Sequence, residues 1–222
     1  MENVLILGAS RGLGRELAKV ILRSGRSVTG CSRKEQLLLE LHKEHAAFDY
    51  IVADFTKPEG QERVLELLRT HSFDRIFYVA GGGPYGPFSS VPWSAQEWGW
   101  TVTFAFAARV LQAINQSESP PQTIVIGSAV AESAADPGAA IYCAAKHALR
   151  GLYQTLRAER PTWDLRLYSP GYMDTDMIPK NAAVRNKGLH APATVAEDLW
   201  RWTLTGEVGS HMMAPKHPEE KM

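Results

Sequence analysis

Short apolar runs alternate with helical patterns along most of this 222-residue chain, and that alternation constrains the fold more than any other feature. The order is typical of βαβ units, in which each helix returns the chain so that successive strands run parallel. Strands are predicted at 4–7, 27–31, 50–53, 75–79, 123–126 and 165–168. Helices are predicted at 12–24, 34–42, 58–70, 94–114, 141–159 and 194–204.

The predicted strands are apolar on both faces, which is expected when helices cover each side of a sheet. We therefore expect an α/β, doubly wound Rossmann fold with a parallel sheet and helices on both faces. No linker divides the chain, so residues 1–222 are predicted to form a single domain. A stretch with little periodicity at about 172–192 is expected to act as a lid. After Gly206 no convincing long final strand is found, and the tail at about 211–222 is expected to fray.

The charge balance argues against two classes of partner. The chain holds 24 basic and 24 acidic residues, so bulk charge does not favour nucleic acid or an anionic membrane. Two cysteines provide neither a disulfide framework nor a zinc-ligand cluster, and no metal site is predicted. The sequence has no apolar run long enough to cross a membrane and no secretory signal pattern, so we expect a cytoplasmic protein.

A glycine-rich turn joins the first predicted strand to the first predicted helix, with the sequence Gly8-Ala9-Ser10-Arg11-Gly12-Leu13-Gly14. Glycine allows a sharp turn and a close approach of the backbone to a diphosphate, whose charge the amides at the helix start can meet. The strand before and the helix after are the context that a dinucleotide site requires. The alternative is a plain strand-to-helix turn.

The end of the second predicted strand bears on the choice of dinucleotide. A carboxylate there would accept hydrogen bonds from the ribose of NAD, but the chain continues instead as Ser32-Arg33-Lys34. A guanidinium binds the dianionic 2′-phosphate of NADP, and Arg11 in the glycine turn is placed to reach the same group. The sequence therefore favours NADP over NAD. Arg33 and Lys34 could instead be solvated residues at a helix start.

Tyr142 and Lys146 are four residues apart in a predicted helix, so they share one helix face. A phenol with a pKa near ~10 becomes useful as an acid or base near neutral pH only with help, which a neighbouring ammonium can give. A pair with this spacing is also common on solvated helix faces. Beside a nucleotide-binding start, the pair becomes a candidate for acid–base chemistry.

Six landmarks follow one another in a familiar order along the chain. They are the glycine turn, Asp54, Ala80-Gly81, Ser128, the Tyr142/Lys146 pair and Pro170-Gly171-x-x-x-Thr175. From residue 4 to about 178 the chain resembles the short-chain dehydrogenase/reductase family.

The resemblance implies a role for each catalytic candidate. Tyr142 would exchange a proton with the oxygen of a carbonyl or alcohol, and Lys146 would lower its pKa and hold the nicotinamide ribose. Ser128 would hydrogen-bond the substrate oxygen, unless it merely ends a strand. Ser133 is the weaker candidate because it lies only nine residues before Tyr142.

For the cofactor, the resemblance places Asp54 at the adenine and Thr175 at the nicotinamide carboxamide, although a turn residue and a loop hydroxyl remain the alternatives. The expected cofactor-binding residues are Gly8, Ser10, Arg11, Gly12, Leu13, Gly14, Ser32, Arg33, Asp54, Phe55, Ala80, Gly81, Tyr142, Lys146, Pro170, Gly171 and Thr175.

Two departures from the family pattern concern asparagine. Tyr78-Val79 precedes Ala80-Gly81 where the family usually has asparagine, and the helix before the serine strand also lacks one. In the family that helix asparagine supports a water-linked proton relay to the lysine. Here either Thr101 or Thr103 holds the water instead, or the relay is weak.

Two functions therefore remain in view. The first is an NADP(H)-dependent oxidoreductase acting on a small carbonyl or alcohol. The second is an NADP-binding sensor or scaffold with little catalytic activity. Trp93, Trp98 and Trp100 mark either a dimer helix or core positions, so a homodimer and a homotetramer both stay open.

Overall fold

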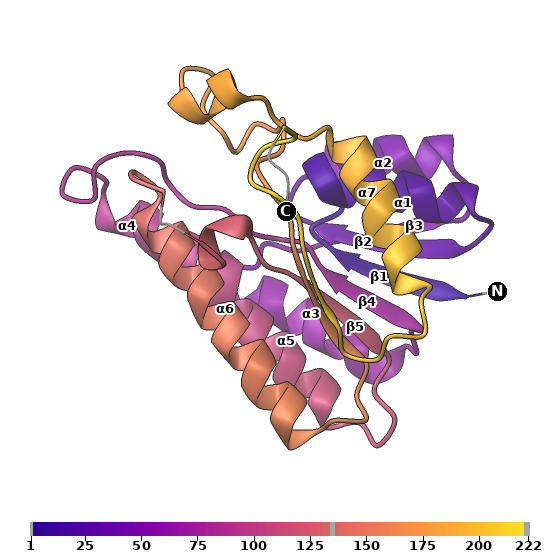
Figure 1. Cartoon of the computed structure of the whole chain (residues 1–222). Coiled ribbons are helices and arrows are strands. Elements are labelled where there is room, and N and C mark those ends of the chain that lie inside the picture. The colour runs from indigo at the N-terminus through magenta and orange to yellow at the C-terminus, as the bar shows by residue number, and fades with distance from the viewer. Residues whose placement is uncertain (1, 134–135, 220–222) are drawn as a thin grey trace.

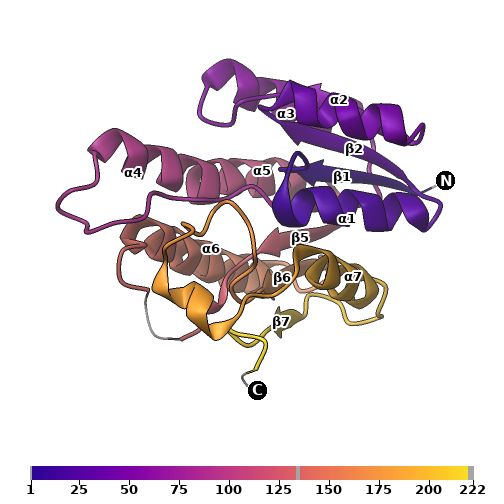
Figure 2. The ribbon, with the colours of Figure 1, turned by 90° about the horizontal axis from the view of Figure 1, so that it is seen from above.

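The computed structural model describes residues 2–133 and 136–219 and confirms a doubly wound parallel α/β fold. A seven-stranded sheet with the order β3-β2-β1-β4-β5-β6-β7 forms its centre, and every strand pair is parallel (Figure 2). The strands are β1 (Asn3–Leu7), β2 (Ser27–Ser32), β3 (Phe48–Val52), β4 (Arg75–Tyr78), β5 (Gln122–Ile126), β6 (Leu165–Ser169) and β7 (His211–Met213).

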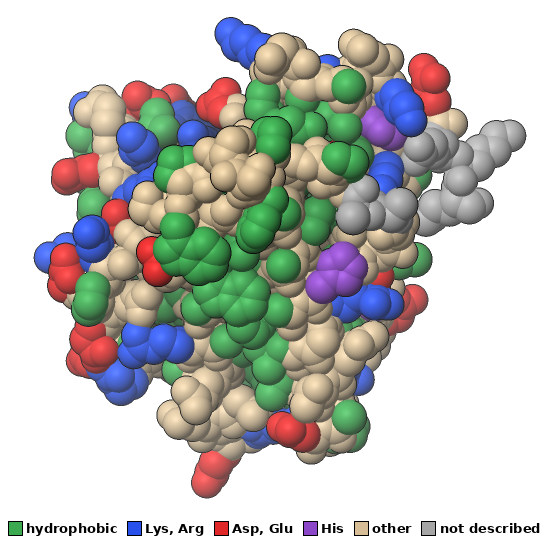
Figure 3. Space-filling view, turned by 90° about the vertical axis from the view of Figure 1, so that its left-hand side faces the viewer, with side chains coloured by type: hydrophobic (Ala, Val, Ile, Leu, Met, Phe, Trp, Pro, Cys, Tyr) green, Lys and Arg blue, Asp and Glu red, His purple; other side chains and the backbone are tan. Residues whose placement is uncertain are grey.

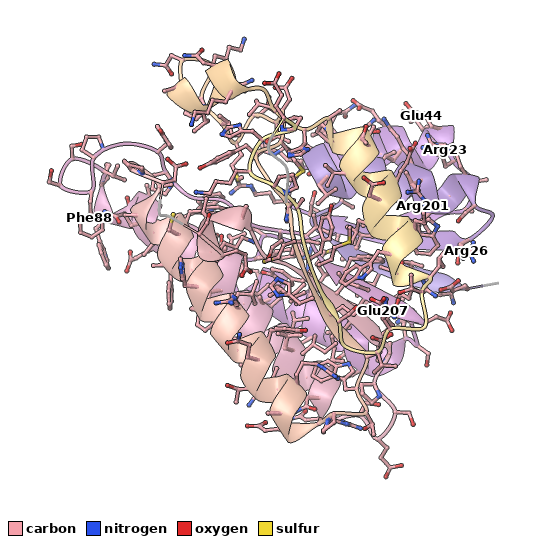
Figure 4. The ribbon with its side chains drawn as sticks, viewed as in Figure 1. Arg23, Arg26, Glu44, Phe88, Arg201 and Glu207 are labelled. Atoms are coloured by element: carbon pink, nitrogen blue, oxygen red, sulfur yellow. The ribbon has the colours of Figure 1, made fainter. Side chains whose placement is uncertain are left out.

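Helices cover both faces of the sheet (Figure 1). One layer contains α1 (Gly12–Arg23), α2 (Glu35–Glu44) and α7 (Pro192–Thr203). The other contains α3 (Pro58–Thr70), α5 (Phe106–Asn115) and α6 (Ala140–Glu159), with α4 (Trp93–Trp100) leading into α5. The outer surface of the first layer is charged, as Arg23 and Arg201 show (Figure 4).

The alternation of side chains along β1 explains the two cores. Val4 and Ile6 pack against the layer of α1, α2 and α7, while Leu5 and Leu7 pack against the layer of α3, α5 and α6. All four are fully buried. Successive strand residues point to opposite faces, so a strand covered on both sides must be apolar throughout.

The helix predicted at 94–114 is interrupted in its middle. Residues Thr101–Ala105 form a π-helical turn, η1, between α4 and α5. A π turn holds one extra residue per turn and shifts the direction of the side chains that follow. The prediction of one regular helix was wrong here, because a hydrophobic pattern alone does not reveal this local change of period.

The expectation of a fraying tail is wrong for residues 211–219. His211–Met213 form strand β7, which pairs with β6, and Ala214 N donates to Ser169 O at 2.9 Å. His217 is buried, with its ring 5.1 Å from the ring of Tyr172. The tail therefore packs beneath the segment that follows β6, and residues 220–222 lie outside the described part of the chain.

Candidate active site

The glycine turn between β1 and α1 has a shape that only glycine permits. Gly8 adopts a φ of 108°, and a β-carbon there would lie 2.6 Å from the amide nitrogen of Ala80. A β-carbon on Gly14 would collide with the carbonyl oxygen of Gly8. The turn consequently brings β1, α1 and the end of β4 into close backbone contact.

The first turn of α1 is open to a bound anion. Arg11 at its N-cap makes no side-chain capping bond, and the first turn contains no acidic residue. Helix-start amides without intrahelical partners carry a partial positive charge. Arg11, Gly12, Leu13 and Gly14 all line a cavity of about 730 Å³. A diphosphate fits such a surface.

Ser128 and Tyr142 meet at the other end of this cavity. Ser128 is the N-cap of a short 3-10 helix, η2 (Ala129–Ala131), that directly follows β5, and it is buried. Its side chain is hydrogen-bonded to that of Tyr142, in the first turn of α6. Ser133 is not placed there: its hydroxyl donates to Ala129 O at 2.9 Å.

An ionic network anchors the loop that carries Ser128. The carboxylate of Glu132 accepts a hydrogen bond from Ser169 at 2.9 Å and lies 3.1 Å from Nε2 of His211. Its other oxygen lies 2.8 Å from Nε of Arg150, an ion pair without hydrogen-bond alignment. Burial lowers the pKa of His211, Arg150 lowers it further, and Glu132 opposes them. The last strand thus fixes the loop that holds the serine.

Lys146 contacts the backbone of β5 as well as the ring of Tyr142. Its Nζ donates to the carbonyl oxygen of Ile126 at 2.6 Å and lies 5.5 Å from the centre of the Tyr142 ring. Burial raises the pKa of Tyr142 to about 12, although the hydrogen bond with Ser128 opposes it. Burial also lowers the pKa of Lys146 to about 7. The expected lowering of the tyrosine pKa by the lysine stays a prediction.

Thr103 occupies the part of the π turn where asparagine is missing. It is fully buried, and its hydroxyl both accepts from Gly82 N at 2.9 Å and donates to Gly82 O at 2.8 Å. Tyr78 donates a hydrogen bond of 2.6 Å to the carbonyl oxygen of Val102. Between them, the two side chains tie the π turn to β4 and to the loop after it.

Acidic and basic groups both line the part of the cavity where the sequence predicts that the adenosine of the cofactor binds. Asp54 accepts two hydrogen bonds from Thr56, through its amide at 3.0 Å and its hydroxyl at 2.8 Å, so it does serve as a turn residue. Burial raises the pKa of Asp54, but the Thr56 hydrogen bonds and the charges of Arg33 and Lys57 outweigh it, and the net direction is down. Ser32 accepts from Lys34 N at 3.2 Å.

The segment at 172–192 lies across the cavity from the glycine turn. A β-carbon on Gly12 would lie 3.3 Å from Cγ2 of Thr175, so the glycine turn and the 172–192 segment are within contact distance. Arg11 forms an exposed ion pair with Asp176 at 3.9 Å. Within the segment, Arg185 donates to Asp174 at 2.7 Å and to Ile178 O at 2.8 Å. The segment has internal structure of its own rather than being a loose loop.

Every site residue predicted from the sequence lines the one cavity. These are Gly8, Ser10, Arg11, Gly12, Leu13, Gly14, Ser32, Arg33, Asp54, Phe55, Ala80, Gly81, Ser128, Tyr142, Lys146, Pro170, Gly171 and Thr175. All except Tyr142 and Lys146, which lie on α6, lie at or after the carboxyl-terminal ends of six strands, β1 to β6, which meet at one edge of the sheet. No group of three or more His, Cys, Asp or Glu side chains within 2–133 and 136–219 could hold a metal ion.

The mouth of the cavity is apolar. Tyr85 and Met177 line it and are exposed, while Phe88 projects from the loop before α4 (Figure 4) and Trp93 begins that helix. Hydrophobic side chains gather on this face of the molecule (Figure 3). Trp98 also lines the cavity, so it is neither a plain core residue nor an outward-facing one. Nothing in the sequence distinguished it from its neighbours Trp93 and Trp100.

Comparison with known proteins identifies the family of the chain. The family model described as short chain dehydrogenase matches residues 2–186. The chain belongs to this family. Among curated relatives of this short-chain dehydrogenase, sepiapterin reductase from Bos taurus is 30% identical over 196 residues, which cover 78% of this chain and 73% of the relative. The uncharacterized oxidoreductase YbbO of Escherichia coli is 27% identical over 210 residues, covering 89% and 77%.

Solved structures show the same fold. An alcohol dehydrogenase from Thermococcus sibiricus in complex with 5-hydroxy-NADP has a TM-score of 0.83 at 24% identity, covering 100% of this chain and 99% of that one. A 4-hydroxyisoleucine dehydrogenase in complex with NADH has a TM-score of 0.84 at 19% identity, and each chain is covered to 98%. The fold is therefore found with either form of the cofactor. Among the described residues of this family member, no helix is long and apolar enough to cross a membrane.

Proposed function

We propose that this short-chain dehydrogenase is an NADP(H)-dependent oxidoreductase that interconverts a carbonyl and an alcohol, with Tyr142 as the acid and base. One observation carries the proposal. A single cavity brings the glycine turn together with Ser128, Tyr142 and Lys146, so a dinucleotide and a carbonyl would meet there. Family membership supports oxidoreductase chemistry.

The residues present fit a nicotinamide dinucleotide. Gly8 and Gly14 leave no room for β-carbons, and the uncapped start of α1 offers free amides to a diphosphate. Arg33 provides a guanidinium for a 2′-phosphate, so we propose NADP(H) as the preferred form. Such a cofactor, when bound, would supply or accept the hydride.

Tyr142 supports the reductive direction in particular. With a pKa of about 12 its hydroxyl keeps its proton at neutral pH, so it can give that proton to the oxygen of a carbonyl as the carbon is reduced. Ser128 would donate a second hydrogen bond to the same oxygen, where negative charge develops. Oxidation of an alcohol would require the phenolate, which the burial of Tyr142 disfavours.

The substrate end of the cavity suits an apolar or aromatic carbonyl compound. Val130, Tyr85, Tyr172, Met177 and Ile178 line it. We propose that the segment at 172–192 closes over the substrate as a lid and excludes water from the reaction. Sepiapterin belongs in a substrate panel because a relative bears the name sepiapterin reductase.

Turnover by Tyr142→Phe tests this function. NADPH oxidation is followed against a panel of aldehydes and ketones, and the best substrate is then compared between wild type and variant. Loss of the general acid should lower turnover about 10²- to 10⁴-fold while NADPH affinity is kept. Tyr50→Phe, which removes a hydroxyl from a tyrosine that does not line the cavity, serves as the control. Full turnover by Tyr142→Phe would overturn the assignment.

An NADP-binding sensor is the second candidate. Lys146 donates to a backbone carbonyl, and the π turn Thr101–Ala105 holds no asparagine, while the hydroxyl of its Thr103 is already bonded to Gly82. A sensor would bind NADPH yet show no oxidation across the panel. Sustained turnover with any carbonyl compound excludes this reading.

A further inference from the structure

Arg33 and Trp98 meet inside the cavity although they come from opposite sides of the fold. Arg33 follows β2, and Trp98 lies on α4, 65 residues later in the chain. The guanidinium carbon of Arg33 is 5.3 Å from the centre of the Trp98 ring, and both residues line the cavity. A cation within about 6 Å of an indole face is attracted by the negative charge of that face.

The indole is held in this position by packing. A β-carbon on Gly82 would lie 2.9 Å from Cη2 of Trp98, so the loop after β4 leaves room for the ring only because residue 82 is glycine. Thr103 fixes the same glycine through both its amide and its carbonyl. The buried Nε1 of Trp98 has no hydrogen-bond partner among the described residues, so packing alone sets the orientation.

The contact with the Trp98 ring prepares Arg33 for an anion. A guanidinium that lies over an aromatic ring keeps N–H donors free for other partners. A long, solvated side chain loses much rotamer freedom when a ligand immobilises it, and stacking removes part of that loss beforehand. The ring therefore favours binding of a phosphate by Arg33 without touching the phosphate itself.

We propose that Trp98 is a positioning residue for cofactor specificity, which holds Arg33 at the adenosine end of the cavity ready for the 2′-phosphate of NADP(H). This inference rests on the proposed function, because it assumes that Arg33 receives that phosphate. It assigns Trp98 a role that depends on Arg33 and on the phosphate together. A ring that stacked on the cofactor itself would not discriminate between NADP and NAD.

The contribution of the Arg33–Trp98 contact is tested by measuring the affinities of two small nucleotides by calorimetry. Adenosine 2′,5′-bisphosphate carries the 2′-phosphate and ADP lacks it, and neither contains the nicotinamide half. The proteins are wild type, Trp98→Leu, Trp98→Phe, Arg33→Ala and the double variant Trp98→Leu/Arg33→Ala. Trp93→Leu is the matched control, since Trp93 lies on the same helix but is 64% exposed and does not line the cavity.

We expect Trp98→Leu to weaken the bisphosphate about twofold to fivefold and to leave ADP unchanged. Trp98→Phe, which keeps an aromatic face, should recover part of the loss. Arg33→Ala should cost more, about tenfold, because it removes a charged hydrogen-bond donor. In the Arg33→Ala background the Trp98→Leu change should have no further effect, and Trp93→Leu should match wild type.

Three outcomes would overturn the proposal. They are an equal loss for both probes, no loss in Trp98→Leu, and a loss that persists without Arg33. Failure of the cofactor assignment itself has a different signature. If wild type bound the two probes equally and Arg33→Ala changed neither, NADP preference would fall together with the role of Trp98. If Arg33→Ala alone reduced bisphosphate binding, only the role of Trp98 would fall.

Discussion

The glycine-turn end of the cavity is formed mainly by backbone, whereas the Ser–Tyr–Lys end is formed by side chains whose pKa values burial has shifted. At the first end Gly8, Gly14 and the start of α1 set the shape. At the second end burial raises the pKa of Tyr142 and lowers that of Lys146. At the first end, cofactor binding should be impaired when atoms are added. At the second end, turnover should be impaired when a functional group is removed.

The strongest test of this contrast adds one methyl group to the backbone-built end. Gly14→Ala places a β-carbon against the carbonyl oxygen of Gly8, which forces β1 and α1 apart. We expect the free energy of unfolding to fall by about 1–3 kcal/mol. NADPH affinity should fall about tenfold or more, because the diphosphate-binding turn is displaced.

Gly151→Ala is the matched control for that variant. Gly151 lies within α6, and a β-carbon there meets no atom within 4 Å. Alanine should stabilise this helix by about 0.5–1 kcal/mol. Chemical denaturation and fluorescence titration measure both effects. Wild-type affinity and stability in Gly14→Ala would show that the turn is less constrained than its geometry indicates.

Removing the hydroxyl of Thr103 tests whether this side chain holds the loop after β4 in place within the cavity. Thr103→Val leaves the buried amide and carbonyl of Gly82 without their partner, which should lower the free energy of unfolding by about 1–3 kcal/mol. Turnover per folded molecule should drop about tenfold as the loop beside Lys146 shifts. Thr103→Ser keeps the hydroxyl and should stay near wild type. Equal losses in both variants would show that the effect is not specific to the hydroxyl.

The pH dependence of stability tests the lowered pKa of Lys146 at the Ser–Tyr–Lys end of the cavity. Because burial lowers the pKa of Lys146 to about 7, the unfolded chain binds a proton between pH 7 and the ordinary lysine pKa of 10.5 that the folded chain has released. Stability should therefore rise with pH across this window. Below pH 7 both states hold the proton, so the contribution becomes constant and unfavourable.

Lys146→Met should remove that slope. The difference in unfolding free energy between variant and wild type, measured in urea at pH 7 and pH 9, should favour the variant more at pH 7. Parallel behaviour of the two proteins between these values would mean that Lys146 keeps its charge in the folded state. Tyr142 does not interfere, because its raised pKa keeps it neutral over the whole range.

The sheet and the order of the site residues could be predicted because both depend on local patterns. Runs such as Val4-Leu5-Ile6-Leu7 must be buried on both faces, and residues that follow parallel strands must meet at one edge. β7 was missed because three residues, His211-Met212-Met213, have no strong strand pattern and become a strand only by pairing with β6. The π turn was missed because it depends on contacts of Tyr78 and Thr103 with distant backbone.

The electrostatic state of the site could not be predicted from spacing. Tyr142 and Lys146 share a helix face as expected, yet Nζ reaches the carbonyl of Ile126, a residue of another element. Burial, which depends on the whole fold, then decides both pKa values. The pairing of Arg33 with Trp98 likewise joins two segments that no local pattern connects.

The position of β7 and the tail has a consequence for how the protein is made. Pro215 O accepts from His190, and Lys216 O accepts from Tyr172 N at 2.8 Å, so the tail forms the floor under the 172–192 segment. During synthesis that segment leaves the ribosome before the residues that support it. A nascent chain ending before residue 211 would hold the glycine turn and Ser128, Tyr142 and Lys146, but not the last strand that anchors the serine loop. We therefore expect binding competence only after residues 211–219 have been added to the growing chain.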